Sequence, residues 1–160
     1  MTNEHSGISR RKLLRTTAIA VPTASVLAFG STLVTAPAAN ALKQDGWWGP
    51  ETSAGLQRFM NRLFPEANLT VDGVITSQPD YYASNCPGIT GGWEWVPSDA
   101  KGSPTIYYVH KWLGWRNPSR YFRDATIEKL QSHYGISPDR RLDGPSQTIQ
   151  ALQNEINQYV

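Results

Sequence analysis

Trp and Tyr side chains are the residues of this 160-residue chain best suited to contact a ligand. An aromatic face can stack on a sugar ring while the indole N–H or phenol O–H forms a hydrogen bond. Exposed aromatic residues therefore favour glycan binding. The candidates are those in expected turns and loops: Trp47, Trp48, Trp93, Trp95, Trp115 and Tyr121. Because Trp47 and Trp48 are adjacent, we expect one to be buried and the other at least partly exposed.

The acidic residues do not form a pattern typical of a hydrolase. A glycosidase needs two carboxyl groups that face each other across a cleft at a controlled separation. Glu94, between Trp93 and Trp95, is the best-placed candidate acid, but a bundle of this size offers little room for a cleft. We therefore expect no enzymatic activity and assign no catalytic residue.

The histidine and cysteine residues predict neither a metal site nor a disulfide. His110 and His133 are 23 residues apart, and neither is followed by a further ligand at the spacing of a zincin helix. Cys86 is the only cysteine, so no intrachain disulfide can form. Its small apolar side chain favours a buried position. No cofactor is expected.

The first 41 residues have the order of an export signal. A basic motif, Ser9-Arg10-Arg11-Lys12-Leu13-Leu14, precedes a moderately apolar run over residues 16–35 and a small-x-small cleavage site, Ala39-Asn40-Ala41. The motif resembles that of twin-arginine signals, with Leu13 where Phe is usual. Thr, Ser, Gly and Pro make the run too polar for a membrane anchor, although an uncleaved anchor or a disordered tail is the alternative. We expect a secreted mature protein of residues 42–160, without stable membrane insertion.

The basic character of the whole chain comes from this export signal. The signal holds four of the 15 basic residues and one of the 13 acidic residues, so the mature part carries 11 basic and 12 acidic residues, a net charge of −1. After Arg15 the longest basic run is the pair Arg140-Arg141. The charge pattern therefore argues against a nucleic-acid partner.

A Thr/Leu-Gln pattern recurs along the mature segment. The copies are Thr52/Leu56-Gln57, Thr126/Leu130-Gln131 and Thr148/Leu152-Gln153, with a degenerate one at Thr105/Val109-His110. Thr, Leu and the apolar residue eight positions after the Thr share one helix face, while Gln lies at its edge. Thr105, Thr126 and Thr148 are separated by 21 and 22 residues. A unit this short cannot bury its own apolar face. We predict tandem helix-turn repeats that pack on one another.

Residues 76–103 interrupt this pattern. They predict a long irregular loop rich in Trp and Gly, in which the alternation of Trp93 and Trp95 favours a short extended segment with both indoles on one side. The insert separates an N-terminal unit, residues 42–75, from a C-terminal unit, residues 104–160. The predicted fold class is therefore all-α, one or more small helical bundles.

Two segments carry a family resemblance. Asp45-Gly46-Trp47-Trp48-Gly49-Pro50-Glu51-Thr52, with Leu56-Gln57 and Phe59, resembles the opening of the peptidoglycan-binding-like repeat, D-G-x-x-G-P-x-T-x-x-x-L/V-x-x-F/L. The segment from Leu142 to Thr148 with Leu152-Gln153 resembles the same motif with a shifted turn. The resemblance implies small three-helix modules, such as those attached to cell-wall hydrolases of bacteria and their phages. The repeats around a Trp-containing insert also resemble the wall-binding tails of some phage lysins.

The chain departs from this family pattern at three places. After Asp72-Gly73 the usual Gly-Pro is replaced by Thr76-Ser77, residues 121–125 contain no Gly-Pro before Thr126, and His110 stands where Gln is usual. The resemblance implies a non-catalytic secreted protein that binds peptidoglycan or an attached wall polymer and associates with the cell wall. Two alternatives stay open, a small wall-degrading enzyme and an interaction module that docks on a separate cell-wall hydrolase.

Overall fold

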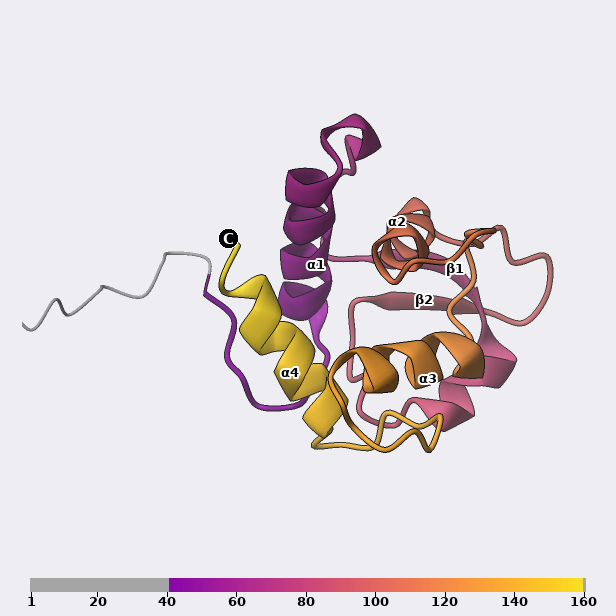
Figure 1. Cartoon of the computed structure of the whole chain (residues 1–160). Helices are drawn as coiled ribbons and strands as arrows, with labels where there is room; N and C mark the ends of the chain where they lie inside the picture. Colours follow the sequence, from indigo (N-terminus) through magenta and orange to yellow (C-terminus); the bar gives the residue numbers. More distant parts are fainter. Residues whose placement is uncertain (1–40, 160) are drawn as a thin grey trace, which may run out of the picture. The chain divides into compact units, whose positions relative to one another are not determined.

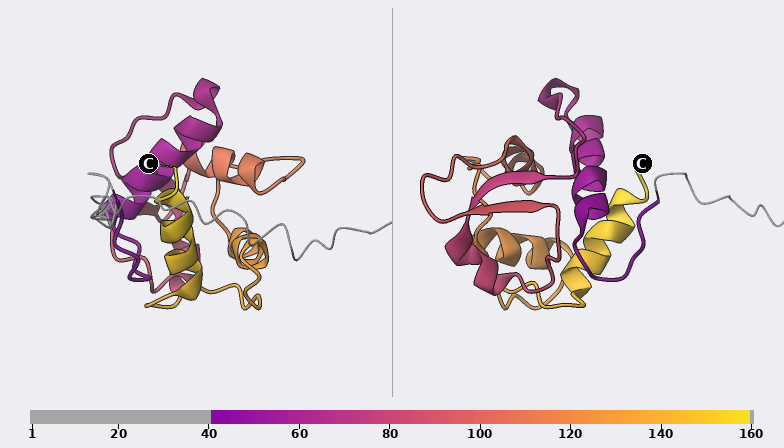
Figure 2. Two further views of the ribbon diagram at one scale, coloured as in Figure 1. Left: turned by 60° about the vertical axis from the view of Figure 1, so that its left-hand side comes forward. Right: turned by 180° about the vertical axis from the view of Figure 1, so that it is seen from behind.

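Helices and a small sheet alternate along the chain. The structure, a computed structural model, describes residues 41–159, so the predicted export signal up to residue 40 lies outside the described residues. In order, the elements are α1 (Pro50–Leu63), the 3-10 helix η1 (Pro65–Ala67), β1 (Ile75–Pro79), the 3-10 helix η2 (Asp80–Asn85), β2 (Trp93–Val96), α2 (Pro104–Trp112), α3 (Asp124–His133) and α4 (Gln147–Ile156). In the described residues α1 and α4 lie side by side, and the two strands lie between α2 and α3 (Figures 1 and 2).

The all-α prediction is wrong, because residues expected to form an irregular loop supply a two-stranded parallel sheet. Ile75 pairs with Trp93, Gln78 with Trp95 and Pro79 with Val96. Thr76-Ser77 replaces the Gly-Pro that begins α1, so no helix starts after the Asp72-Gly73 turn. The β-branched Ile75 and Thr76 favour extended backbone instead, and β2 supplies a partner strand. The extended conformation expected around Trp93 and Trp95 is present, and their rings stack 5.2 Å apart.

The helix starts follow local capping rules. Pro50 occupies the first turn of α1, where its missing N–H is not needed, and Glu51 places a negative charge near the positive end of the helix dipole. Ser103 caps α2 by accepting from the Thr105 N–H, and Ser146 caps α4 by accepting from the Ile149 N–H. Pro145 therefore precedes the cap of α4 rather than beginning the helix.

An aromatic cluster joins the N-terminal segment, the insert and the C-terminal segment, which the sequence predicts to be separate. Trp48, just before α1, contacts Trp93 of β2 and Phe122, just before α3, with ring centroids 5.2 and 6.3 Å from its own. Trp48 and Phe122 are each about 1% exposed. Burying side chains of this kind stabilises a fold by about 1.5–3 kcal/mol each. The N-terminal segment, the insert and the C-terminal segment therefore share one core.

The Gln residues of the repeat hold turns rather than simply edging an apolar stripe. The Gln57 amide of α1 donates to Asp72 Oδ1 at 2.7 Å and to the Val74 carbonyl, and its Oε1 accepts from the Gly73 N–H at 2.9 Å. Gln131 of α3 makes the corresponding bonds to the turn at Asp139–Arg141. In each case a buried amide fixes the turn that leads to the next element.

Cys86 is the only cysteine of the chain, and the sequence predicts that it is buried. Cys86 is 3% exposed, so the burial predicted for its thiol is confirmed. Burial raises the pKa of this thiol to about 12, which keeps it protonated. Among residues 41–159, no helix combines the length and the apolar character that crossing a bilayer requires.

Candidate functional site

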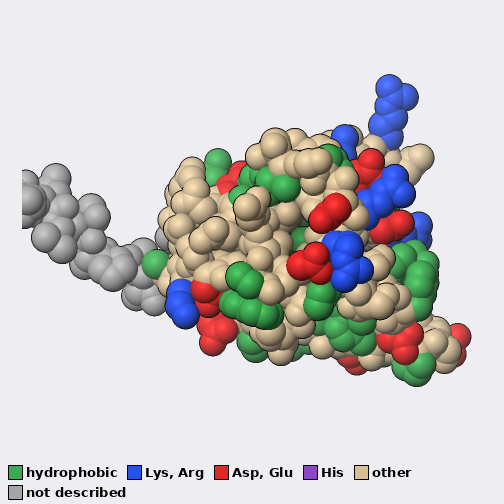
Figure 3. Space-filling view, turned by 90° about the horizontal axis from the view of Figure 1, so that it is seen from below, with side chains coloured by type: hydrophobic (Ala, Val, Ile, Leu, Met, Phe, Trp, Pro, Cys, Tyr) green, Lys and Arg blue, Asp and Glu red, His purple; other side chains and the backbone are tan. Residues whose placement is uncertain are grey.

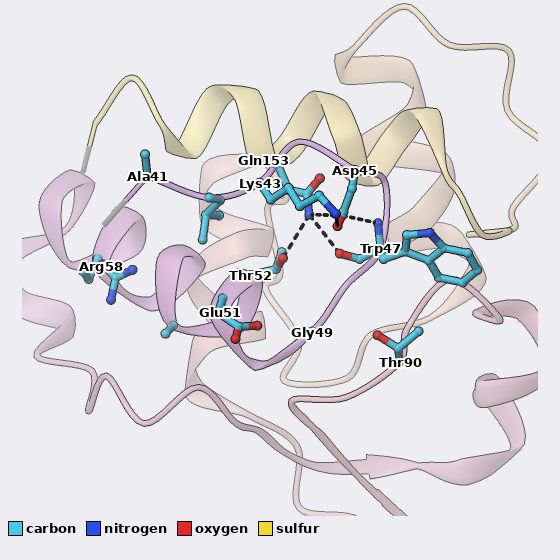
Figure 4. A pocket seen from close by; sticks show the side chains of 12 residues that line it. Ala41, Lys43, Asp45, Trp47, Gly49, Glu51, Thr52, Arg58, Thr90 and Gln153 are labelled. Atoms are coloured by element: carbon cyan, nitrogen blue, oxygen red, sulfur yellow. Dashed lines mark hydrogen bonds and ion pairs between the residues drawn. The ribbon is translucent and has the colours of Figure 1, made fainter. Parts of the chain in front are cut away.

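A depression lies between the N-terminal segment, α1 and α4. It has a volume of about 630 Å³, within the range of ligand pockets. Figure 4 shows Arg58 at one end and Trp47 with Thr90 at the other. We call it the Trp47 groove, and its lining includes the side chains of Lys43, Asp45, Trp47, Glu51, Arg58 and Thr90.

Gln153 of α4 fixes the turn on which the Trp47 groove is built. Its Nε2 donates to the Trp47 carbonyl at 2.9 Å and to Thr52 Oγ1 at 3.2 Å, and its Oε1 accepts from the Gly46 N–H at 3.0 Å. Gly46 has φ +76°, and a Cβ there would meet Ser146 backbone atoms at 2.8–2.9 Å. Only glycine therefore fits this position, and the turn is held closely against the start of α4.

The Asp45 carboxylate completes the turn. Its Oδ1 accepts from the Trp47 N–H at 3.0 Å and from Gln153 Nε2 at 3.3 Å. The Trp47 N–H, then Gln153 and Lys43, lower the pKa of this carboxyl group below its ordinary value. Asp45 is therefore ionised at neutral pH and acts as a hydrogen-bond acceptor.

The segment before this turn is hydrogen-bonded along α4 and to the residue that follows it. Asn157 accepts from the Leu42 N–H at 2.6 Å and donates to the Leu42 carbonyl at 2.9 Å. Gln150 donates to the Gln44 carbonyl at 2.9 Å. The Leu42 side chain is 9% exposed and packs where a Cβ on Gly55 would collide with it. The wall of the Trp47 groove is thus held at several points by α4.

Trp47 is the exposed aromatic residue of the groove. It is 39% exposed, and its six-membered ring lies against Gly144, where a Cβ would overlap the ring atoms. One part of the indole is therefore packed on the Gly144 backbone, while the residue stays 39% exposed at the end of the groove that also holds Thr90 (Figure 4). Since the turn and Gly144 both restrain it, the Trp47 ring has a fixed orientation.

The charges around the groove are of both signs. Lys43 and Asp45 form an exposed ion pair at 3.4 Å. Arg58 and Glu51 form no ion pair with another residue of the described part, and the Arg58 Nε is buried without a partner there. The groove therefore offers carboxylate acceptors and guanidinium and ammonium donors along its length, and one aromatic ring and the Thr90 hydroxyl at one end.

The structure does not bring the six predicted aromatic residues together. Trp48 is 1% exposed and donates from Nε1 to Ser53 Oγ at 2.9 Å, so it is a core residue and not a contact residue. Trp93 and Trp95 are half-buried on the sheet, and Trp115 stacks on His110 with centroids 4.2 Å apart. Tyr121 borders a different depression. Of the six, only Trp47 lies at the Trp47 groove.

His110 has a structural position. It is fully buried, its Nδ1 accepts from the Ser119 N–H at 2.9 Å, and its Nε2 lies 2.9 Å from Thr126 Oγ1. Burial, followed by the charge of Arg123, lowers the pKa of His110 to about 4, so its ring is neutral at pH 7. Within residues 41–159, no group of three potential ligand side chains is placed to hold a metal ion.

Sequence reasoning missed several residues of the site. Arg58 is a polar residue on a predicted helix, Thr90 lies in the long insert, and Gly144 lies 97 residues after the Trp47 that it supports. Gln153 belongs to the repeat, but the pattern predicts only that it lies at the edge of the apolar helix face. The Thr/Leu-Gln register was the available signal, because a Gln retained at the border of an apolar face has polar partners to hold.

Comparisons with known proteins add no relative. No family model matches the sequence, and neither a curated protein nor a solved structure matches it. The resemblance to the peptidoglycan-binding-like repeat stays a prediction from short motifs. Any function assigned to this chain therefore rests on the geometry of the site.

Proposed function

We propose that this is a non-catalytic secreted protein that binds bacterial peptidoglycan, with the Trp47 groove as its glycan site. The observation that carries the proposal is the placement of Trp47. An indole 39% exposed is held by a buried hydrogen-bond network and by Gly144 at the rim of a polar groove. The same residue lies in the motif that resembles a wall-binding repeat.

A restrained aromatic ring suits a sugar ligand. Stacking on the apolar face of a pyranose uses the indole surface, and little conformational entropy is lost because Trp47 is already fixed. Peptidoglycan sugars carry hydroxyl and N-acetyl groups that need both donors and acceptors. Asp45 and Glu51 supply acceptors, and Arg58 supplies donors, within the same groove.

The distribution of charge supports a ligand of low charge density. Acidic and basic side chains are interspersed on the face of the described residues seen in Figure 3. A nucleic-acid partner would favour a continuous basic surface. A glycan chain, by contrast, is recognised by stacking and individual hydrogen bonds.

The carboxyl groups support binding rather than catalysis. A glycosidase acid keeps its proton near neutral pH because its pKa is raised, whereas the pKa of Asp45 is lowered by its hydrogen bonds. Glu94 is exposed on β2 and accepts from the Ser77 N–H at 2.8 Å, and it does not line the Trp47 groove. This arrangement does not favour the wall-degrading alternative.

A pull-down with purified sacculi tests the proposal. The full chain should sediment with sacculi, and Trp47→Ala should weaken binding about tenfold, the effect of losing about 1.4 kcal/mol of aromatic contact. Tyr159→Ala is the matched control, since Tyr159 is also 39% exposed but lies outside the groove, and it should bind like the wild type.

Three outcomes would contradict the proposal. Wild-type protein that stays in the supernatant would remove peptidoglycan binding altogether. Clearing of a peptidoglycan zymogram would indicate the enzyme. Co-purification with a cell-wall hydrolase, without binding to bare sacculi, would indicate the interaction module.

A further inference from the structure

A second depression lies where the two strands of the sheet end. Parallel strands run in one direction, so β1 ends at Pro79 and β2 ends at Val96 on the same side (Figure 1). The chain then diverges into η2 after β1 and into the 97–103 loop after β2. Crevices at the carboxyl ends of parallel strands are common ligand sites because the departing segments leave space between them. Here the space measures about 370 Å³.

Two tyrosines of η2 form an aromatic wall on this depression. Tyr81 is 66% exposed, the highest value among the large hydrophobic residues of the described part, and its ring centroid lies 3.8 Å from that of Tyr82. A ring that is two-thirds exposed contributes little to the core. Tyr81 therefore presents aromatic surface at the edge of the depression, and its ring packs against that of Tyr82.

Residues just before α3 close the other side. The Tyr121 hydroxyl donates to the Ala100 carbonyl at 2.8 Å, which fixes the ring against the 97–103 loop. The Arg123 guanidinium lies over the Tyr121 ring, 5.4 Å from its centroid. A guanidinium stacked in this way keeps N–H groups free at its edge for a ligand. Asp99 lines the same depression and supplies an acceptor.

These residues match a neutral sugar better than an anion. Arg123 is the only basic residue of the depression, and Asp99 offsets its charge. Tyr82 adds a phenol hydroxyl, and burial raises the pKa of this group to about 12, so it stays protonated. Stacked aromatic surface with a few donors and acceptors is the chemistry that recognises a pyranose ring with hydroxyl and N-acetyl substituents.

We propose that this depression, the Tyr81 groove (Tyr81, Tyr82, Asp99, Tyr121 and Arg123), is a second glycan subsite that binds another sugar ring of peptidoglycan. This inference rests on the proposed function. The Tyr81 groove and the Trp47 groove share no lining residue. One molecule would then contact the polymer at two places, and two weak contacts would combine into tighter attachment to the wall.

Sacculus binding by four variants of the full chain tests the second subsite. Tyr81→Ala should weaken binding by about fivefold to tenfold, the range expected for one stacking contact. Tyr81→Phe should bind like the wild type, because it keeps the ring and removes only the hydroxyl. Combining Tyr81→Ala with Trp47→Ala should weaken binding more than either change alone, and Tyr159→Ala should again have no effect. Tyr81 is so exposed that these changes leave the fold intact, which circular dichroism would verify.

A soluble N-acetylglucosamine tetramer gives an independent measurement. Its addition should shift the ring NMR signals of Tyr81 and Tyr121 in the wild type, and the Tyr121 shift should be lost in Tyr81→Ala. Wild-type binding of sacculi by Tyr81→Ala, with weakened binding by Trp47→Ala, would overturn the second subsite and leave the proposed function intact. Failure of the wild type to bind sacculi would overturn both. Loss of binding in Tyr81→Ala only when wall proteins are retained on the sacculi would assign the groove to a protein partner and overturn the sugar subsite.

Discussion

Gln153 and Asp45, 108 residues apart in the sequence, are joined by a hydrogen bond of 3.3 Å from the Gln amide to the carboxylate. The bond links α4 to the turn that precedes α1. Asp45 also accepts from the Trp47 N–H, so the turn is held both from within and by α4. The position of Trp47, and with it the Trp47 groove, therefore depends on the last helix.

The same arrangement occurs twice more with the same pairs of atoms. Gln57 bonds to Asp72 Oδ1 at 2.7 Å and Gln131 to Asp139 Oδ1 at 2.6 Å. In all three turns the residue after the Asp has positive φ: Gly46, Gly73 and Arg140. The third residue after each Asp is buried, namely Trp48, Ile75 and Leu142. Each Gln therefore positions a core side chain through the turn that it holds.

His110 occupies the equivalent place in the degenerate copy. Its Nδ1 accepts from the Ser119 N–H, and Ser119 Oγ accepts from the Tyr121 N–H as the Asp does in the other turns. The third residue after Ser119 is the buried Phe122. Four helices thus hold four turns, and α4 holds the one that precedes α1.

Removing the Gln153 amide should destabilise the protein. Gln153→Ala leaves the buried Gly46 N–H without its partner and removes the Nε2 group that donates to Asp45 and to the Trp47 carbonyl, so we expect a loss of about 2–4 kcal/mol in the free energy of unfolding. Urea denaturation measures this loss. Gln150→Ala, on the exposed side of α4 with one bond to the Gln44 carbonyl, should lose less than about 1 kcal/mol. Equal losses in the two variants would show that the Gln153 network does not stabilise the turn.

Substitution by Ala should affect mainly stability at Trp48 and mainly binding at Trp47. Trp48→Ala removes a buried ring of the core and should cost about 3–5 kcal/mol in unfolding free energy. Trp47→Ala should cost less than about 1.5 kcal/mol while weakening sacculus binding, because much of that ring faces solvent. Thermal unfolding and the pull-down separate the two effects. A Trp47→Ala protein as unstable as Trp48→Ala would instead assign Trp47 to the core.

The sequence predicted the helices well because their signals are local. Pro50 and Glu51 mark the start of α1, and the Thr, Leu and Ile positions of the repeat recur at helical spacing. The sheet could not be predicted in the same way, since β1 and β2 pair residues such as Ile75 and Trp93 that are 18 positions apart. A five-residue strand with Gln and Pro carries little periodicity, and its conformation depends on the partner strand.

The candidate site was predictable only in part for the same reason. The Trp47-Trp48 pair predicted one buried and one exposed ring, but residue type alone does not decide which. The Trp48 indole reaches Ser53 and Trp93, contacts that exist only after the insert has folded back. The turn at Asp139–Arg141 lacks the Gly found in the other two, so its similarity to them appears only in the hydrogen bonds of Gln131.

Gly144 should be necessary for the orientation of Trp47. A Cβ at this position would overlap the indole ring, so Gly144→Ala should displace Trp47, change the NMR shift of its indole N–H and weaken sacculus binding several-fold. Gly91→Ala is a suitable control, since a Cβ there meets only Pro50 side-chain atoms at 3.3–3.6 Å. Unchanged Trp47 signals in Gly144→Ala would contradict the support assigned to this glycine.

His110 should make stability depend on pH between about 6.5 and 4. The pKa of the buried ring is lowered to about 4, so in this window the unfolded chain binds a proton that the folded protein does not. Stability is therefore fully present above about pH 6.5 and falls as the pH decreases towards 4, by about 3 kcal/mol if the whole shift is expressed. Urea denaturation as a function of pH measures this dependence. His110→Gln places the residue of the other copies at this position and should flatten the curve in this window, whereas Gln150→Ala, which removes no titratable group, should not. Because acidic groups such as Asp45 and Asp139 titrate in all three proteins, the difference in shape between the His110→Gln and Gln150→Ala curves isolates His110, and curves of identical shape would show that its ring does not control this dependence.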